Sequence, residues 1–287
     1  EEVIHVIEKA EAEGKTTVRL HTGDPCIYGA IREQMDILDE KNIAYDYCPG
    51  VSAFCGAASA LNLEYTLPDI SQSVIITRME GRTPVPSKES IQSFAAHQAT
   101  MVVFLSTGML EELSRRLIEG GYTADTPAAI VYKATWPEQK TFVCTVGTLA
   151  KTAAENNITK TALMIIGDTV AAAHYDRSKL YDPGFTTEFR MAESSHSGKI
   201  VSAVPEMAAS GKLYVVGMGP GSLDGMTKEA FKAIGDCQVI AGYTVYADLV
   251  KPYFPDKEYL TTPMTKEEAR CRMAFECCME GKDTAMI

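Results

Sequence analysis

The chain has 287 residues, of which 46% are hydrophobic and 23% charged, and its formal net charge is −11. This composition is typical of a globular protein with a buried core, and the length allows about two domains. The acidic balance argues against nucleic acid as a partner, because nucleic acid is usually bound by a basic face. We also expect no membrane partner, since the sequence contains no run of about 18 apolar residues and no signal segment at its start.

The eight cysteines are spread along the chain, and no two of them form a C-x-x-C pair. No histidine stands at zinc-finger spacing from them, so the sequence predicts no metal site. Most of the cysteines lie beside apolar or small residues, which is typical of buried and reduced thiols. We therefore expect a cytoplasmic protein with structural cysteines.

Apolar spacing near the start of the chain alternates between helix and strand periods, which predicts a parallel sheet covered by helices. The expected helices span residues 1–14, 28–41 and 52–61, and the expected strands span 16–21 and 44–48. Gly23-Asp24-Pro25 ends the first strand and Pro49-Gly50 ends the second. We assign residues 1–71 to one α/β domain, which lacks a first strand and glycine loop of its own.

A second α/β domain is expected over residues 72–184, followed by a linker over 185–211 that loses periodicity and gathers Ser, Gly, Glu and His. The expected strands of the second domain are 74–77, 100–105, 128–132 and 162–166, with a helix over 110–119. Residues 212–287 then begin a new β-α-β pattern. Its expected strands are 213–216, 238–241 and 284–287, and its expected helices are 228–234 and 266–279.

One short segment occurs twice in the chain. Glu13-Gly14-Lys15 recurs as Glu280-Gly281-Lys282, 267 positions later, and a strand is expected after each copy. Solenoid repeats have periods of about 20–50 residues, so this period indicates a repeated domain. We interpret the chain as the back of one enzyme joined to the front of a related one, each clipped within a motif.

The segment Gly217-Met218-Gly219-Pro220-Gly221 follows an expected strand and precedes an expected helix. Glycines there permit positive φ and close approach of a ligand to the backbone. Ser222 breaks the dinucleotide G-x-G-x-x-G pattern, and Pro220 lacks the N–H that a phosphate would bind. The loop suits a nucleoside better than a dinucleotide, although a purely structural turn is nearly as consistent with it.

Three more loops follow strands, and each leaves two interpretations open. Asp24 is able to accept hydrogen bonds from a ribose or to cap the following helix, and Ser52 is either a site residue or a plain N-cap. Arg78 and Arg82 flank Glu80, so they bind carboxylates of a ligand or pair with local acids.

Taken together, these motifs resemble the tetrapyrrole (precorrin) methylases. Residues 1–190 are similar to the precorrin-4 or cobalt-precorrin-4 C11-methyltransferases, through Gly23–Ala30, Pro49–Phe54, Ile76–Pro84 and Val131–Pro137. Residues 212–287 are similar to the opening of precorrin-3B C17-methyltransferases, through Val215–Gly221 and Ala241–Leu249. The implied fold is a two-domain α/β architecture, a parallel N-terminal-type domain and a mixed-sheet C-terminal-type domain, followed by a partial second module.

The resemblance implies S-adenosyl-L-methionine as the cofactor and a methyltransferase of cobalamin biosynthesis. The cofactor site carried over by motif comprises Gly23, Asp24, Pro25, Ile27, Ser52, Ala53, Leu105, Ala134, Thr135, Gly219, Pro220 and Gly221. An anionic precorrin would be the substrate, with Arg78, Arg82 and Lys133 as the candidates for binding its carboxylates. The resemblance names no catalytic base, and by analogy it implies a homodimer.

Residues 212–264 would supply the strand and glycine loop that residues 1–71 lack, so we expect them to dock as in a circular permutant. Two alternatives remain at this point. An NAD(P)-binding oxidoreductase is favoured only by the glycine loop, and a non-catalytic fragment would result if each cofactor site is split.

Overall fold

The computed structural model describes residues 2–171, 211–263 and 266–287. The chain divides into two compact units, Glu1–Asp176 and Arg177–Ile287, which are described here one at a time. Almost all of the predicted linker at 185–211 lies outside the described residues. The predicted domain limits and the predicted docking of residues 212–264 stay predictions.

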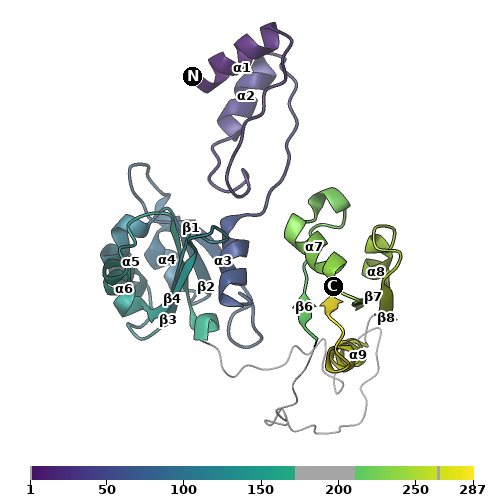
Figure 1. The fold of residues 1–287 in the computed structure, drawn as a ribbon. Helices are drawn as coiled ribbons and strands as arrows, with labels where there is room; N and C mark the ends of the chain where they lie inside the picture. The colour runs from purple at the N-terminus through teal and green to yellow at the C-terminus, as the bar shows by residue number, and fades with distance from the viewer. Residues whose placement is uncertain (1, 172–210, 264–265) are drawn as a thin grey trace. The chain divides into compact units, whose positions relative to one another are not determined.

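Unit 1 contains a mixed five-stranded sheet (Figure 1). Its strands follow the order β1-β2-β5-β3-β4. The strands are β1 (Val74–Arg78), β2 (Thr100–Phe104), β3 (Pro127–Tyr132), β4 (Lys140–Thr145) and β5 (Ala162–Ile166). β1 runs parallel to β2, while β5 runs antiparallel to both β2 and β3. It follows that β1, β2 and β3 point the same way and that their carboxyl ends share one edge of the sheet.

Helices cover both faces of this sheet. α4 (Ile91–Ala95), α5 (Leu110–Glu119) and α6 (Leu149–Glu155) enclose a core with Met101, Ile130 and Met164 on one face. On the other face, α3 (Ala53–Leu61) packs Ala57 against alternate residues of the same strands. The short 3₁₀ turns of unit 1 are Ser87–Glu89, Thr107–Met109, Val146–Thr148 and Asp168–Ala171. The central strands carry near-continuous apolar runs because both of their faces are buried.

The first fifty residues differ from the sequence prediction. α1 (Glu2–Ala12) and α2 (Arg32–Glu40) form where helices are expected, and Lys41 Nζ lies 2.6 Å from Glu8 Oε1 between them. The predicted strands at 16–21 and 44–48 are wrong, because both segments are extended without strand pairing among the described residues (Figure 1). A strand is defined by its backbone hydrogen bonds to a neighbouring strand. Alternation of apolar and polar residues in the sequence does not by itself supply that neighbour.

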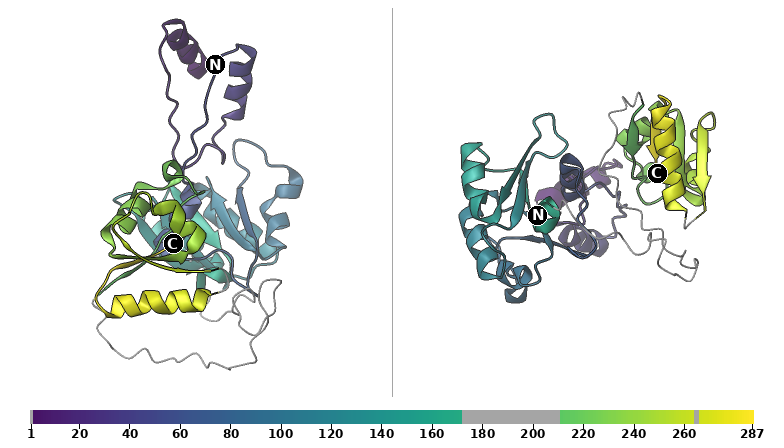
Figure 2. Two further views of the ribbon diagram at one scale, coloured as in Figure 1. Left: turned by 90° about the vertical axis from the view of Figure 1, so that its right-hand side faces the viewer. Right: turned by 90° about the horizontal axis from the view of Figure 1, so that it is seen from below.

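Unit 2 contains a parallel four-stranded sheet with the order β6-β9-β7-β8. Its strands are β6 (Leu213–Val215), β7 (Val239–Tyr243), β8 (Glu258–Thr262) and β9 (Thr284–Met286). The helices are α7 (Lys228–Asp236), α8 (Thr244–Val250) and α9 (Glu267–Met279), with a 3₁₀ turn at Leu223–Gly225. α7 and α8 pack on one face of the sheet and α9 on the other (Figure 2).

The predicted fold class is confirmed: unit 1 carries the mixed α/β sheet and unit 2 a parallel one. β4 and β8 were not predicted from the sequence, and each lies at one edge of its sheet. Both contain exposed polar residues, and their apolar signal is correspondingly weak.

Candidate functional site

Asp24 joins two loops that are far apart in the sequence. Its Oδ2 accepts a hydrogen bond of 2.7 Å from the Gly50 N–H, and its Oδ1 accepts one of 2.8 Å from the Cys26 N–H. The Tyr47 hydroxyl also donates to Oδ1. Donation from the Cys26 thiol, from Tyr47 and from the two amides holds the pKa of Asp24 well below its usual range, and the same carboxylate raises the pKa of Tyr47 to about 12. In this structure Asp24 therefore acts as a clamp between the Gly23–Pro25 loop and the Pro49–Ala53 loop.

Glycines permit the close contact between these two loops. A Cβ atom on Gly50 would lie 2.2 Å from the Gly23 carbonyl oxygen, which no side chain allows. Gly23 has a φ of +68° and lies against the backbone of Ser52 and Ala53. Within the first loop, a Cβ on Gly29 would lie 2.2 Å from the Pro25 carbonyl oxygen, so residues 25–29 form a tight turn around half-buried Ile27.

The N-terminal end of α3 brings a third segment to the same place. Ser52 is buried and holds the extended N-cap conformation, but its side chain makes no capping hydrogen bond. One turn later, a Cβ on Gly56 would lie 2.9 Å from Thr135 Cγ2 and 3.7 Å from Ala134 Cβ. Predicted site residues from Gly23, Ser52–Ala53 and Ala134–Thr135 therefore lie in one neighbourhood.

The carboxyl edge of the sheet carries an unusual group of backbone conformations. Leu105 follows β2 with a φ of +52° and a side chain 70% exposed, and Lys133 and Thr135 follow β3 with φ of +46° and +69°. Positive φ is uncommon in residues other than glycine, and for a bulky exposed leucine it is a strained state. Such strain is concentrated at ligand sites, so this edge is the best candidate site in unit 1.

Tyr28 connects the Asp24 loop to that edge. Its ring centroid lies 5.6 Å from that of Phe104, the last residue of β2. Burial raises the pKa of the Tyr28 hydroxyl, and the positive charge of Arg78 opposes this increase. Because Arg78 is the last residue of β1, Tyr28 lies near the end of that strand. The turn that contains Pro25 and Ile27 thus reaches the ends of β1 and β2.

The two predicted arginines have different environments. The Arg78 guanidinium donates to the carbonyl oxygens of Met79 at 3.1 Å, Thr83 at 3.3 Å and Pro84 at 2.9 Å. It therefore holds the loop that follows β1. Arg82 is exposed within this loop, and among the described residues no hydrogen bond or ion pair engages it. Of the two, Arg82 is the one available to bind a ligand.

Lys133 is held by its own hairpin. Its ammonium group lies 5.2 Å from the centroid of the Trp136 ring, 5.5 Å from that of Tyr132 and 3.5 Å from a Glu138 carboxylate oxygen. The hairpin itself is fixed, since Gln139 Oε1 accepts from the Thr135 N–H at 2.6 Å and the Lys133 N–H donates to the Thr161 carbonyl at 2.9 Å.

In unit 2 the glycine loop is a compact turn. Gly219 has a φ of +73°, and its Cβ would lie 2.3 Å from the Gly225 carbonyl oxygen. Pro220 packs against Gly225 in turn, and Ser222 Oγ accepts from the Gly225 N–H at 3.2 Å. Gly221 has a φ of +123°, with only a Leu249 methyl at 4.0 Å from its Cβ position. The turn itself therefore requires glycine at position 219 and favours it at position 221, and the predicted cofactor role of Gly219, Pro220 and Gly221 stays a prediction.

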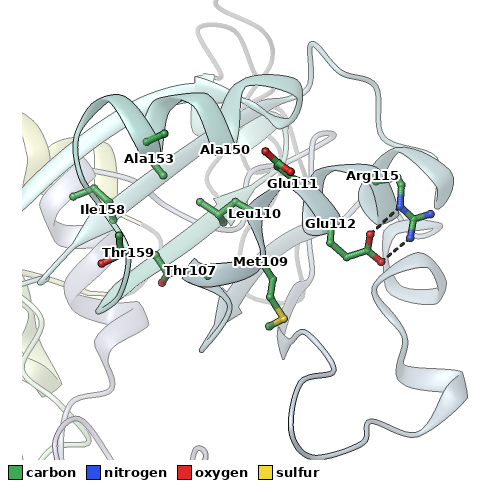
Figure 3. A pocket seen from close by; sticks show the side chains of 12 residues that line it. Thr107, Met109, Leu110, Glu111, Glu112, Arg115, Ala150, Ala153, Ile158 and Thr159 are labelled. Atoms are coloured by element: carbon green, nitrogen blue, oxygen red, sulfur yellow. Dashed lines mark hydrogen bonds and ion pairs between the residues drawn. The ribbon is translucent and has the colours of Figure 1, made fainter.

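A groove of about 720 Å³ lies between α5 and α6 (Figure 3). Ala150, Ala153 and Ile158 form an apolar part of it, and Glu112 at its rim is paired with Arg115 at 2.6 Å. None of the predicted site residues lines this groove.

Three residues near the candidate site were missed by the sequence analysis: Tyr28, Tyr47 and Trp136. Trp136 and Tyr28 fall inside motifs that carry the family resemblance, so aromatic character within a motif was an available signal. Tyr47 lies 23 positions from Asp24, and no pattern in one sequence relates the two.

Comparison with known proteins identifies the family. The profile of the family described as "Tetrapyrrole (Corrin/Porphyrin) Methylases" matches residues 1–150 and 212–287. A cobalt-precorrin-4 C(11)-methyltransferase from Methanocaldococcus jannaschii is 48% identical over 190 residues, which is 66% of this chain and 73% of that protein. The corresponding enzyme from Priestia megaterium is 41% identical over 198 residues, or 68% of this chain and 77% of that protein.

Comparison with solved structures agrees with this family. A cobalt precorrin-4 methyltransferase shares 40% identity with a TM-score of 0.57, covering 58% of this chain and 70% of that one. A uroporphyrin-III C-methyl transferase from Thermus thermophilus, complexed with S-adenyl homocysteine, shares 20% identity with a TM-score of 0.50 and covers 59% of this chain and 73% of that one. At that identity the second likeness shows the fold alone.

The fold and the matches define a methyltransferase built from α/β units. The chain belongs to the tetrapyrrole methylase family. The family and the enzyme class predicted from the motifs are confirmed, and the predicted S-adenosylmethionine cofactor agrees with them. The C17 identity of residues 212–287 stays a prediction.

The described residues contain no cluster of three or more His, Cys, Asp or Glu side chains able to hold a metal ion. No helix in the described ranges has the length and apolar character needed to span a membrane.

Proposed function

We propose that this protein transfers a methyl group from S-adenosylmethionine to C11 of precorrin-4 or cobalt-precorrin-4 in cobalamin biosynthesis. The relatives with 48% and 41% identity are cobalt-precorrin-4 C(11)-methyltransferases, and a Sinorhizobium precorrin-4 C(11)-methyltransferase is 40% identical. One structural observation supports the proposal most strongly. Segments that contain Gly23, Ser52 and Thr135 meet beside a sheet edge at which the backbone of Leu105 is strained.

The residues at this edge suit a nucleoside sulfonium cofactor. Leu105, Ala53 and Ala134 offer small or apolar surface to a ligand. Because Gly23 has no side chain, its backbone lies against that of Ser52, and a ligand bound here would lie close to backbone groups. Asp24 is committed to the loop junction, so we propose that it shapes the cofactor site and leaves direct contact with the cofactor to its neighbours. When bound, the cofactor supplies an electrophilic methyl group for an in-line displacement.

The protein's own contribution in this proposal is positioning. Arg82 binds a carboxylate arm of the substrate, and Arg78 keeps the loop of Arg82 in place through its three carbonyl contacts. Lys133 offers a second cation at the same sheet edge. Orientation of two reactants in contact accounts for a large part of catalysis in such displacements, and we assign no general base.

For residues 212–287 we propose the opening of a C17-type methylase. The family profile covers this segment, and its glycine loop follows the first strand of a parallel sheet. A cytoplasmic location and a homodimer are parts of the same proposal, drawn from the class of enzyme.

Calorimetric titration with S-adenosylhomocysteine tests the proposal on the full chain. We expect binding to the wild type and a loss of about 10- to 100-fold in affinity for Asp24→Asn, because an amide NH₂ meets the Gly50 N–H where an acceptor stood. Asp46→Asn is the matched control. It removes an exposed carboxylate from the segment that leads to Gly50, and it should keep wild-type affinity.

Three other outcomes would contradict parts of this proposal. Binding of NAD in place of S-adenosylhomocysteine favours the oxidoreductase alternative. A folded protein that binds neither ligand favours the non-catalytic fragment. Unchanged affinity in Asp24→Asn removes the proposed role of the loop junction.

A further inference from the structure

The hairpin loop between β3 and β4, residues 133–139, presents the single tryptophan of the chain. Trp136 is 49% exposed, although aromatic side chains of this size are usually covered. The loop around it is fixed at both ends: the Trp136 N–H donates to the Lys133 carbonyl at 3.0 Å, and the Gln139 N–H donates to the Trp136 carbonyl at 3.0 Å. A large indole is thus held half in water by a rigid turn.

Strained backbone conformations at Lys133 and Thr135 shape this turn. A positive φ is unfavourable for a residue other than glycine, so a hairpin selected only for stability would avoid both conformations. Strain of this kind persists where the resulting geometry has a use. Here the geometry exposes Trp136 and keeps the Lys133 ammonium group 5.2 Å from its ring centroid.

We propose that Trp136 is a stacking platform for one face of the tetrapyrrole substrate and that Lys133 binds a carboxylate arm of the same molecule beside it. This inference rests on the proposed function and adds a substrate-contacting residue to it. A flat conjugated ring system stacks well on an indole, and a cation next to the indole favours a ligand with anionic arms.

The sheet topology supports a wide ligand. β1 and β3 are separated by β2 and β5, so the loops of Arg82 and Trp136 start three strand spacings apart along one edge, roughly 14 Å. A macrocycle with carboxylate arms is broad enough to reach from an indole platform toward a cation at that separation. A small anion binds at only one end of such an arrangement.

Glu138 gives the proposal a second, independent consequence. Its carboxylate lies 3.5 Å from Lys133 Nζ, the position that a carboxylate arm of the substrate would take. Glu138 therefore competes with the ligand for Lys133, and its removal should strengthen binding. A variant that gains affinity cannot be explained by misfolding.

The test measures binding of uroporphyrin, a stable tetrapyrrole with acetate and propionate arms, to the full chain by its absorbance change, with S-adenosylhomocysteine calorimetry on each variant. Trp136→Ala should weaken uroporphyrin binding about tenfold, and Trp136→Phe should weaken it less. Glu138→Gln should strengthen it about two- to fivefold. Ile118→Ala, which trims an exposed apolar residue of α5, is the matched control and should leave binding unchanged.

The outcomes separate this inference from the proposed function. Normal S-adenosylhomocysteine binding with unchanged uroporphyrin affinity in Trp136→Ala and Glu138→Gln overturns the platform and leaves the proposed function intact. Absence of S-adenosylhomocysteine binding in the wild type overturns the proposed function itself. A gain in Glu138→Gln together with a loss in Trp136→Ala supports the platform.

Discussion

The two copies of the repeated segment have the same local structure and different tertiary structure. α1 ends at Ala12 and α9 at Met279, the equivalent position 267 residues later. After α1, the Gly14 N–H bonds to Glu11 O at 2.9 Å and the Lys15 N–H to Ala10 O at 2.9 Å. After α9, the Gly281 N–H bonds to Cys278 O at 3.1 Å and the Lys282 N–H to Cys277 O at 3.0 Å. Both helices thus end in a Schellman motif with glycine at positive φ.

Beyond that cap the copies diverge. In unit 2 the chain enters the sheet as β9, between β6 and β7, and both Thr284 and Ala285 are fully buried. After Gly14 the equivalent residues form no strand among the described residues, and Val18 and Leu20 are 75% and 79% exposed. A helix end is therefore encoded by a few neighbouring residues, whereas a strand depends on partners elsewhere in the chain.

Charge placed in the strand position should have the largest effect and should differ most between the copies. Ala285→Asp puts a carboxylate into the middle of a sheet, at a fully buried position, which should destabilise unit 2 by about 3–5 kcal/mol. Val18→Asp changes an exposed residue at the equivalent position and should alter stability by less than about 0.5 kcal/mol.

Hydrogen exchange of peptides from β6, β7 and β9 measures this difference in the full chain. Fast exchange in these peptides is expected for Ala285→Asp only. If Val18→Asp destabilises the protein by as much, residues 16–20 have strand partners in solution, and the contrast between the copies does not hold.

The same distinction explains what the sequence could predict. β2, β3 and β5 were recognisable because burial on both faces leaves nearly uninterrupted apolar runs, and the edge strand β1 begins with three apolar residues. The segment at 16–21 has a strand-like sequence too, yet the residues that would pair with it could not be identified from the segment itself. The candidate site follows the same rule: Gly23-Asp24-Pro25 and Pro49-Gly50 were each recognisable, but the clamp from Asp24 to Gly50 spans 26 positions that no local pattern connects.

Substitution of the two cap glycines should have a smaller effect, and an equal one in both copies. Gly14 and Gly281 have φ of +67° and +90°, and alanine in this region costs about 1 kcal/mol because of its own Cβ. Burial differs between the copies, but this backbone cost does not depend on it. Exchange rates of the Lys15 and Lys282 amides in Gly14→Ala and Gly281→Ala measure the loss of each cap. Unequal effects would show that tertiary packing, and not local sequence, sets the helix ends.

The smallest difference is expected at the lysine that follows each glycine. Lys282 Nζ lies 3.1 Å from Glu258 of β8 and 3.5 Å from Glu280, whereas Lys15 pairs with nearby Glu13. The hydrogen bond to Glu258 raises the pKa of Lys282 above its ordinary 10.5. A raised lysine pKa means that its stabilising contribution is fully present below pH 10.5 and is lost as the pH rises through the folded-state pKa.

Melting temperatures of Lys282→Met and Lys15→Met against wild type, at neutral pH and above pH 10.5, test this point. A slight decrease is expected for Lys282→Met at neutral pH, since exposed ion pairs contribute little, and this decrease should shrink in alkaline solution and in high salt. Lys15→Met should change nothing measurable, because its pair connects residues of one loop. An equal decrease in both variants would mean that the lysine acts through the shared cap and not through β8, which would extend the similarity of the two copies one residue further.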